Sequence, residues 1–468
     1  MRSTFGGLET ASRSLAAQQA AMDLAAHNLA NVNTPGYTRQ SVRLTPMAGA
    51  GLVTGAAGRP ADSIGGGVDV TGIVRIREAF LDRQARDTAA TGSSWKSRRD
   101  TLSRVETIFG EPSDNGLAAQ LQEFWNAWGE VAAHPSLASA RSALRGTAGT
   151  MASTFRRIAA GLSENRAALD NSFRALASEV NNAVSRISDL NRKIMTSTVS
   201  NLPAGDLEDA RDLLADRLSA LTGARVTTES DGSMRVFIGG TELVGSYTFQ
   251  TINITDDAAN GNLAKATWAN GGQDVTGLGG EMAALLTLRD GDLPSLGTEI
   301  DALVASVVAQ TNAPHQAGFG LDGVSGRDFF DPVGTTAATI DLSDAVKADS
   351  SVIAASVSGE VGDGANASAI AALGSQEITA GSKPGDYYAG VLSELGTSVA
   401  EATNETDTFD ALGRQIENQR ATVSGVSPDE EMIDLMRYQR AYQAAARVLT
   451  TLDEALDTLI NRLGAVGR

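Results

Sequence analysis

The chain has 468 residues, a formal net charge of -18 and no cysteine. A chain of this length exceeds what one hydrophobic core usually serves, so we expect several domains. The negative charge disfavours nucleic acid and membranes as partners, and the lack of cysteine excludes disulfides, thiolate nucleophiles and cysteine-based metal sites. Residues 1–15 lack the basic and apolar regions of a cleavable signal peptide, and no later stretch predicts a membrane span.

A coiled-coil helix is predicted at the N-terminus, over residues 5–32, because apolar residues recur there every seven positions. The segment 33–36, Asn-Thr-Pro-Gly, ends the helix, since proline restricts the preceding residue to extended geometry and glycine permits a tight turn. Residues 37–77 then contain short β-like runs, which predict an extended or hairpin excursion. The heptad row of the helix consists of Leu8, Leu15, Met22 and Leu29.

The next part of the chain has a helical pattern as far as Gly223. Helices are predicted over residues 78–109, after a cap at 113–115, and over 151–194, where two adjacent heptad rows indicate an elongated strut. A further amphipathic helix over 206–221 stops at Gly223, a residue type that commonly caps helix C-termini. These segments predict a helical shaft.

A change to period two after Gly223 marks the start of a β-rich segment. Two short strand patterns flank Asp231-Gly232, a strong hairpin signal. A helix over residues 281–311 interrupts the β-like pattern, and short strands are predicted again in the glycine- and aspartate-rich residues 318–372. Because a shaft of helices surrounds both β stretches in sequence, we predict that they form one inserted domain.

The last helix has the clearest start in the chain. Ser427 is a favourable N-cap, Pro428 suits the first helical position and Glu430 completes a capping box. The helical pattern covers residues 387–463 apart from a break at 424–426. On periodicity alone, the two terminal stripes fit packing within one chain better than packing between chains, and both options stay open. The heptad row of the last helix includes Leu435, Tyr442, Leu449 and Leu456.

Signals for enzymatic chemistry are weak. His27, His134 and His315 are isolated in sequence and lack a second ligand at metal-binding spacing, so surface or packing roles are expected. Residues 318–323 match G-x-G-x-x-G, but this run follows a helix and does not open one, which argues against dinucleotide binding. We therefore predict no catalytic residue, no cofactor and no metal site.

The strongest signal is a resemblance to a known family. Residues 26–40, AHNLANVNTPGYTRQ, are similar to the N-terminal signature of the flagellar rod, hook and hook-associated axial proteins, and two runs within 424–448 are similar to their terminal helix. Segments 279–290 and 323–330 favour the hook-associated protein 1 branch over the rod and hook relatives, and 312–320 also fits. The residues of the signature motif are Asn31, Asn33, Thr34, Pro35, Gly36 and Tyr37.

The resemblance implies a mainly α protein with an inserted β domain, in which N- and C-terminal coiled-coil helices form the core of an axial tube. The two terminal heptad rows are then the candidate assembly seam. The domains expected are a terminal coiled-coil core (1–36 and 428–468), a helical middle domain with the short β excursion (37–222 and 381–427), and an outward β-rich domain with the helix near 281–311 (223–380).

The resemblance also implies a function, that of a non-enzymatic structural adapter joining the flagellar hook to the filament. Expected partners are further copies of the chain, the hook protein, and a second junction protein or the flagellin side. An export chaperone is expected at the C-terminal region. The family implies export through the flagellar type III apparatus, hence an extracellular location without a cleavable signal peptide.

Two other functions stay open on the sequence. Another axial subunit of the flagellum, such as a hook or rod protein, shares the terminal signatures, but the central segments argue against it. A cytosolic coiled-coil scaffold would not explain the Asn-Thr-Pro-Gly-Tyr signature or the β insert.

Overall fold

The computed structural model describes residues 4–47, 65–200 and 202–458. The chain forms two compact units, each assembled from segments that are distant in sequence. Unit 1 takes Met1–Ala89, Val180–Thr251 and Ala411–Arg468, and unit 2 takes Ala90–Glu179 and Ile252–Asp410.

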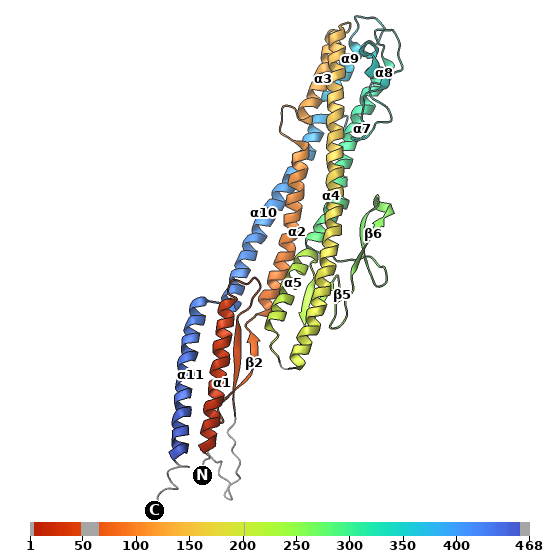
Figure 1. Ribbon diagram of the computed structural model, residues 1–468. Helices are drawn as coiled ribbons and strands as arrows, with labels where there is room; N and C mark the ends of the chain where they lie inside the picture. Colours follow the sequence, from red (N-terminus) through yellow and green to blue (C-terminus); the bar gives the residue numbers. More distant parts are fainter. Residues whose placement is uncertain (1–3, 48–64, 201, 459–468) are drawn as a thin grey trace, which may run out of the picture. The chain divides into compact units, whose positions relative to one another are not determined.

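Helices dominate the described residues (Figure 1). They are α1 (Thr4–Ala30), α2 (Ala79–Phe109), α3 (Leu117–Ala133), α4 (Ala138–Val199), α5 (Gly205–Thr222), α6 (Gly280–Thr287), α7 (Leu293–Ala317), α8 (Asp344–Ala348), α9 (Ala365–Ala372), α10 (Pro384–Ser424) and α11 (Pro428–Asp457). A π-helical turn, Leu288–Asp292, joins α6 to α7, and short 3-10 turns occur at Ala258–Asn260, Ser350–Val352 and Leu373–Ser375.

The strands form small antiparallel sheets. Strands β1 (Gln40–Pro46) and β2 (Val68–Arg75) form a pair, β3 (Arg225–Thr228), β4 (Met234–Ile238) and β5 (Thr241–Val244) form a three-stranded sheet, and β6 (Ile252–Asp257) pairs with β7 (Leu263–Trp268). The turn between β3 and β4 contains Gly232 in the left-handed region, as the Asp231-Gly232 pattern predicts. The predicted fold class, mainly α with β insertions, is confirmed.

The predicted β-rich segment 223–380 does not coincide with one of the compact units. Strands β3 to β5 lie in unit 1, whereas β6 and β7 lie in unit 2. The domain boundaries expected from the sequence, and the outward position of this segment, stay predictions.

The short strands predicted within residues 318–372 are wrong. The structure forms isolated bridges there, such as Phe319 with Ser356, and the helices α8 and α9. Side chains take the place of a neighbouring strand: the Asp363 carboxylate accepts hydrogen bonds from the backbone N–H groups of Val357 and Ser358, each at 2.9 Å. Such local side-chain bonds compete with sheet ladders, which explains why an Asp- and Ser-rich run becomes a loop.

The helix ends follow the sequence pattern in some places and not in others. Gly223 is the left-handed C-cap of α5, as expected. The side-chain cap predicted for α3 at residues 113–115 is wrong, because Gly116 is the N-cap and makes no such bond. Instead the Glu111 carboxylate accepts a hydrogen bond from the Ala118 N–H at 3.0 Å. Helix α4 begins at Ala138, earlier than the heptad rows indicate.

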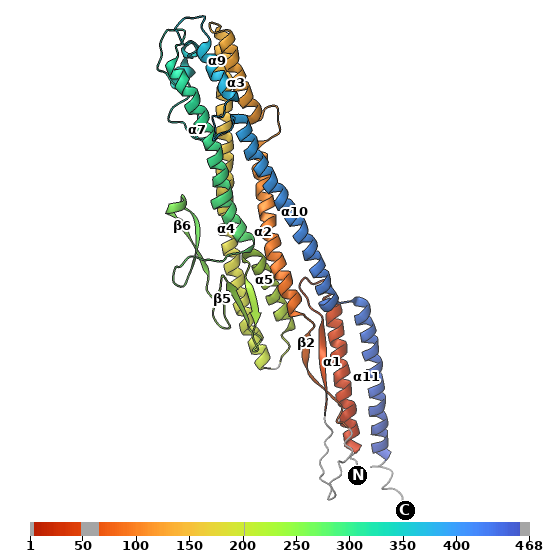
Figure 2. The same ribbon diagram turned by 180° about the vertical axis from the view of Figure 1, so that it is seen from behind.

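Within unit 1, α1 packs against α11 and against the β1–β2 pair. Both views show α1 and α11 side by side, with their outer ends at the two termini (Figures 1 and 2). The predicted continuation of the last helix to Leu463 lies outside the described residues.

Within unit 2, an aromatic core joins α3 to the segment after α7. The ring centroids of Trp128 and Phe329 are 5.0 Å apart, and those of Phe124 and Phe330 are 5.7 Å apart. The Asn312 carboxamide oxygen accepts hydrogen bonds from the N–H groups of Phe329 and Phe330 at 3.0 and 2.9 Å. The central segments within 312–330 therefore carry a packing role in this unit.

His315 is buried in this aromatic core. Its Nε2 atom accepts a hydrogen bond from the Ala354 N–H at 2.9 Å, and its Nδ1 atom lies 2.7 Å from the Arg327 carbonyl oxygen. The Nδ1 atom therefore carries the proton of a neutral ring. Burial lowers the pKa of His315 to about 4.

We predict that unit 2 loses stability as the pH falls through the range set by His315. An unfolded histidine binds a proton below about pH 6.5 while the folded ring stays neutral to about pH 4, so acid favours the unfolded state. The loss expected between pH 7 and pH 5 is about 2 kcal/mol. Urea unfolding followed by tryptophan fluorescence measures it, because all 4 tryptophans lie in unit 2.

The control is His315→Gln, whose carboxamide offers one donor and one acceptor but does not titrate. This variant should lose less stability than the parent chain between pH 7 and pH 5. An equal loss in both chains would contradict the assignment of the effect to His315.

Candidate functional site: the terminal helices and their joint

The helices α1 and α11 run antiparallel in one copy of the chain. Near one end of α1, a Cβ atom added to Gly7 would lie 3.3 Å from Leu452 Cδ1. Near the other end, the Asn28 carboxamide donates a hydrogen bond to Glu431 at 3.1 Å. Alanines dominate the buried face of α1, which allows close approach of its neighbours; the buried apolar residues of this helix are Ala11, Ala17, Ala21, Leu24 and Ala25.

The eight predicted seam residues lie along this pair and are all half-buried in the single chain. On α1, the most deeply buried positions are therefore offset from the predicted leucine row. The leucine rows keep accessible apolar area that could be covered by another molecule. Their assignment as an assembly seam stays a prediction. The half-buried residues are Leu8, Leu15, Met22 and Leu29 on α1, and Leu435, Tyr442, Leu449 and Leu456 on α11.

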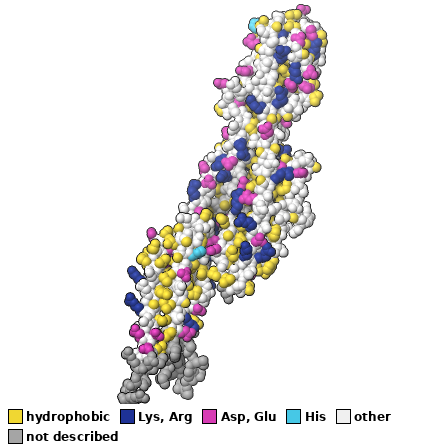
Figure 3. Space-filling view, viewed as in Figure 1, with side chains coloured by type: hydrophobic (Ala, Val, Ile, Leu, Met, Phe, Trp, Pro, Cys, Tyr) yellow, Lys and Arg dark blue, Asp and Glu magenta, His cyan; other side chains and the backbone are white. Residues whose placement is uncertain are grey.

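A second apolar surface on α11 is not among the predicted seam residues. Met432, Ile433, Met436 and Val448 are exposed, and Ile433 has 60% of its surface accessible. Figure 3 shows hydrophobic side chains gathered over the part of unit 1 that contains α1 and α11. Exposed apolar groups at this density are typical of surfaces that bind other proteins. We call these four residues the outer face of α11.

The signature residues form the turn that ends α1. The Asn31 carboxamide donates to the His27 carbonyl at 3.1 Å, and the Thr34 hydroxyl donates to the Asn31 side chain at 3.1 Å. The Tyr37 N–H bonds the Thr34 carbonyl, and Gly36 has φ of +77°, a conformation that glycine adopts readily. Asn33, Thr34, Pro35 and Gly36 are exposed, and Tyr37 is half-buried.

Asn28 lies at the centre of the joint between α1, β1 and α11. It is only 2% exposed. Its amide nitrogen donates to the Gln40 carbonyl and to Glu431, at 2.9 and 3.1 Å. Its oxygen accepts from the Tyr37 hydroxyl and the Gln40 N–H, at 2.7 and 3.1 Å. All four hydrogen-bonding positions of this carboxamide are thus satisfied, which fixes one geometry for the joint.

Glu431 is the partner on α11 and is 3% exposed. The Arg39 Nε atom donates to its carboxylate at 2.6 Å, and Arg39 also pairs with Glu430 at 3.0 Å. Ser427 caps α11 as predicted, since its side chain accepts a hydrogen bond from the Glu430 N–H. The start of α11 is therefore held by a partly buried ion pair in addition to its cap.

A charged cluster in unit 1 continues from the joint. The Asp209 carboxylate accepts from the Thr38 N–H at 2.9 Å and from Arg75 at 2.7 Å. Arg75 also pairs with Asp212 at 2.7 Å, and Arg77 bonds the same carboxylate. The cluster thereby ties the residues before β1 and the end of β2 to α5.

Burial and neighbouring charges shift the pKa values of this cluster in opposite directions. Burial alone would raise the pKa of Asp212, but Arg77 and Arg75 outweigh it and hold that pKa below its usual range. Burial likewise acts to lower the pKa of Arg75, yet the carboxylates of Asp212 and Glu208 raise it above its ordinary value. Burial raises the pKa of Tyr37, and nearby carboxylates add to the effect. All of these groups keep their ordinary charge near neutral pH.

Sequence reasoning missed the residues that hold the joint, namely Asn28, Arg39, Glu431 and Asp209. Two of them, Asn28 and Arg39, lie inside the quoted signature but are outside any heptad row. Glu431 precedes Leu435 by four positions and so extends the α11 stripe toward Ser427 with a charged residue. A polar residue on an otherwise apolar stripe is the signal that could have indicated a buried contact.

The central segment 279–290 has its own structural role, in unit 2. Arg289 in the π-helical turn is buried, donates to Asp170 on α4 at 2.6 Å, and donates to the Ala264 carbonyl of β7 at 2.8 Å. Its guanidinium lies 5.5 Å from the ring centroid of Phe173. This residue joins the β6–β7 pair to α4.

Among the described residues, no group of three or more His, Asp or Glu side chains could hold a metal ion. No helix in that part of the chain is both long and apolar enough to cross a membrane. His27 lies beside Asp206 at 3.3 Å and against the Tyr37 ring, where it contributes to the joint.

Family profiles match three parts of the chain. The profile of the flagellar hook-associated protein FlgK helical domain matches residues 102–330. The profile of the flagella basal body rod protein matches residues 8–38, and that of the flagellar basal body rod FlgEFG protein C-terminal region matches 414–463. The last two matches cover most of α1 and α11.

Similar proteins span the whole chain. Flagellar hook-associated protein 1 of Bacillus subtilis is 31% identical, with all of both chains covered. The protein of that name from Escherichia coli is 24% identical over 97% of this chain and 99% of its own length. The flagellar hook junction protein FlgK from Burkholderia pseudomallei has a similar fold, with a TM-score of 0.65, 16% identity, and 73% of this chain and 100% of that chain covered. The chain belongs to the flagellar hook-associated protein 1 family.

Proposed function

We propose that the chain is a structural adapter of the bacterial flagellum that joins the hook to the filament. As a family member it is an axial subunit that associates with the hook and with copies of itself, and it works in the extracellular flagellum. The observation that carries the proposal is the terminal pair α1 and α11, which combines half-buried heptad rows with the exposed outer face of α11. Exposed apolar area has a free-energy cost in a free monomer, and assembly that covers this area removes the cost.

The joint supports this role mechanically. Helix pairs that bind a lattice must keep one geometry relative to the rest of the subunit. The network of Asn28, Arg39 and Glu431 fixes the end of α1 against the start of α11 within unit 1. A subunit built this way can match two different neighbours, a hook below and a further junction or filament protein above.

The test is binding to hooks isolated from cells that lack their own hook-associated protein 1. We expect the purified chain to sediment with these hooks and to label only their distal ends in electron micrographs. Hooks that already carry filaments are the control, and they should bind none of the purified chain. Labelling along the whole hook would support a hook subunit instead, and an absence of binding would contradict the proposal.

We also propose that an export chaperone covers α11 before assembly, and that the chain leaves the cell by the flagellar export apparatus without cleavage of a signal peptide. The exposed outer face of α11 supports the first part, because an uncovered row with Met432, Ile433 and Met436 favours aggregation in the cytosol. N-terminal sequencing of the flagellar form tests the second part. We expect it to begin within the first residues of the chain; a start displaced by a leader-sized segment would contradict this.

A further inference from the structure

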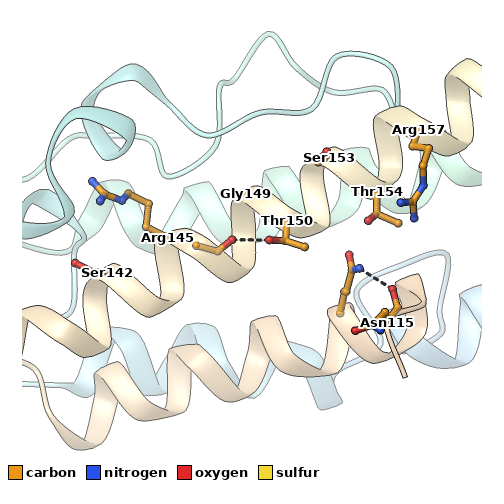
Figure 4. Close-up of a pocket in the computed structure, with 10 residues that line it drawn as sticks. Asn115, Ser142, Arg145, Gly149, Thr150, Ser153, Thr154 and Arg157 are labelled. Atoms are coloured by element: carbon orange, nitrogen blue, oxygen red, sulfur yellow. Dashed lines mark hydrogen bonds between the residues drawn. The ribbon is translucent and has the colours of Figure 1, made fainter. Parts of the chain in front are cut away.

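Unit 2 presents a polar groove along the first half of α4. The groove has a volume of about 620 Å³. Figure 4 shows Arg145 and Arg157 toward the two ends of this stretch of α4, with Gly149 and Thr150 between them and Asn115 on the opposite side. A neighbouring groove of about 550 Å³ shares Asn115 and Arg157 and extends the hollow. Glycines and residues with hydroxyl side chains thus line this face of α4 over several helical turns.

Two polar groups in this groove lack partners within the described chain. Gln120 is 8% exposed, and its amide nitrogen donates to the Asn115 carbonyl, but its buried Oε1 atom accepts no hydrogen bond. Arg157 is exposed and makes no ion pair with any described residue. An unpaired buried acceptor has a cost that a donor from another molecule would remove.

The charge of this surface is opposite to that of the whole chain. Arg145 and Arg157 line this groove and no aspartate or glutamate does, although Glu164 lines the neighbouring groove. A groove with this charge in a chain of net charge -18 favours an acidic partner.

The same unit carries a matching acidic surface on α10. Residues 384–410 contain six aspartates and glutamates and no lysine or arginine. Asp386, Glu394 and Glu401 are exposed, and none of them forms an ion pair with a described residue. The outward side of this helix also carries Asn404, whose amide can donate hydrogen bonds, and Thr397, whose hydroxyl donates to the Ser393 carbonyl at 2.8 Å.

The local potential at α10 is consistent with this excess of negative charge. Burial raises the pKa of Glu299 on the adjacent α7, and the charge of Glu394 raises it further. Neither Glu299 nor Glu394 forms an ion pair with a described residue, although Arg98, which pairs with Asp292 at 3.0 Å, lines the same hollow. A cation supplied by another molecule would therefore be favourable here.

We propose that the groove on α4 of one copy receives the acidic outward face of α10 from a second copy of the chain. The inference rests on the proposed function, since it names a contact that copies make after joining the hook. It is a heterologous contact, so each bound copy leaves a free groove on one side and a free acidic face on the other. Charge complementarity would orient the incoming subunit.

The chain has no cysteine, which allows a clean cross-linking test. Ser153→Cys places a thiol on the groove side of α4, and Thr397→Cys places one on the outward face of α10; both positions are exposed. We expect a mixture of the two single variants, bound to hooks and mildly oxidised, to give disulfide-linked dimers. Each variant alone should give few or none.

A charge-reversal experiment gives a second, independent readout. The double variant Arg145→Glu with Arg157→Glu should bind hooks about tenfold more weakly at low salt. Combination with Glu394→Lys and Glu401→Lys should restore binding, and tryptophan fluorescence reports whether unit 2 stays folded.

The outcomes separate the two proposals. Normal hook binding of the parent chain, with no mixed disulfide and no effect of charge reversal, would overturn this inference and leave the proposed function intact. Failure of the parent chain to bind hooks would overturn the proposed function and this inference with it.

Discussion

Replacement of Asn28 by alanine is expected to destabilise the joint of α1, β1 and α11 by roughly 3–5 kcal/mol. The change removes four hydrogen bonds and leaves the Tyr37 hydroxyl, the Gln40 backbone and the Glu431 carboxylate without this partner in a buried site. Water cannot easily replace it, because both Asn28 and Glu431 are almost fully buried. The cost should appear as local opening and not as loss of the whole fold.

Hydrogen exchange measures this prediction at defined amides. The Gln40 N–H, which donates to Asn28, and the Glu431 N–H, which donates to the Ser427 carbonyl, should exchange faster in the variant. Asn33→Ala is the matched control, since Asn33 belongs to the same signature but is exposed. Equal exchange in the Asn28→Ala variant and the parent chain would show that the joint does not depend on this carboxamide.

The second large effect is expected from Leu449→Asp. Leu449 is half-buried in the pair of α1 and α11, and a carboxylate there must either lose hydration or push the helices apart. A penalty of about 2–4 kcal/mol corresponds to a loss of binding of roughly 30- to 1000-fold. Incorporation at the hook end should therefore be abolished at ordinary protein concentrations.

Two controls separate the seam from general misfolding. Leu449→Met conserves volume and should bind hooks almost normally. Thr450→Asp adds the same charge at an exposed neighbour and should leave the free chain as stable as the parent. Tryptophan fluorescence should show unit 2 folded in all three variants. Normal incorporation of the Leu449→Asp variant at the hook would contradict the assignment of these heptad rows as the assembly seam.

The sequence predicts the long helices well because their signal is local. Heptad spacing, the Ser427 cap and the left-handed Gly223 each act over a few residues. Helices α1 and α5 begin and end close to the predicted positions, and α11 begins at the predicted Pro428. The prediction of strands within 318–372 is wrong because the deciding contacts are not periodic. Side chains such as Asp363 bind backbone groups that would otherwise pair in strands.

The candidate site could be predicted only in part. Periodicity finds the apolar rows but does not distinguish a face covered within one chain from a face left for another molecule. The joint depends on pairs such as Asn28 with Glu431 and Thr38 with Asp209, which lie 403 and 171 positions apart in sequence. Such long-range polar contacts leave no periodic signal, and only the fold brings them together.

Assembly through the terminal helices can be tested by hydrogen exchange of the free and the hook-bound chain. On binding, amides of α1 and α11 should become protected at least about tenfold, as expected for helices whose accessible rows are covered. Amides in the buried core of unit 2 should change little. Unchanged exchange in both terminal helices, with new protection confined to unit 2, would contradict assembly through these helices.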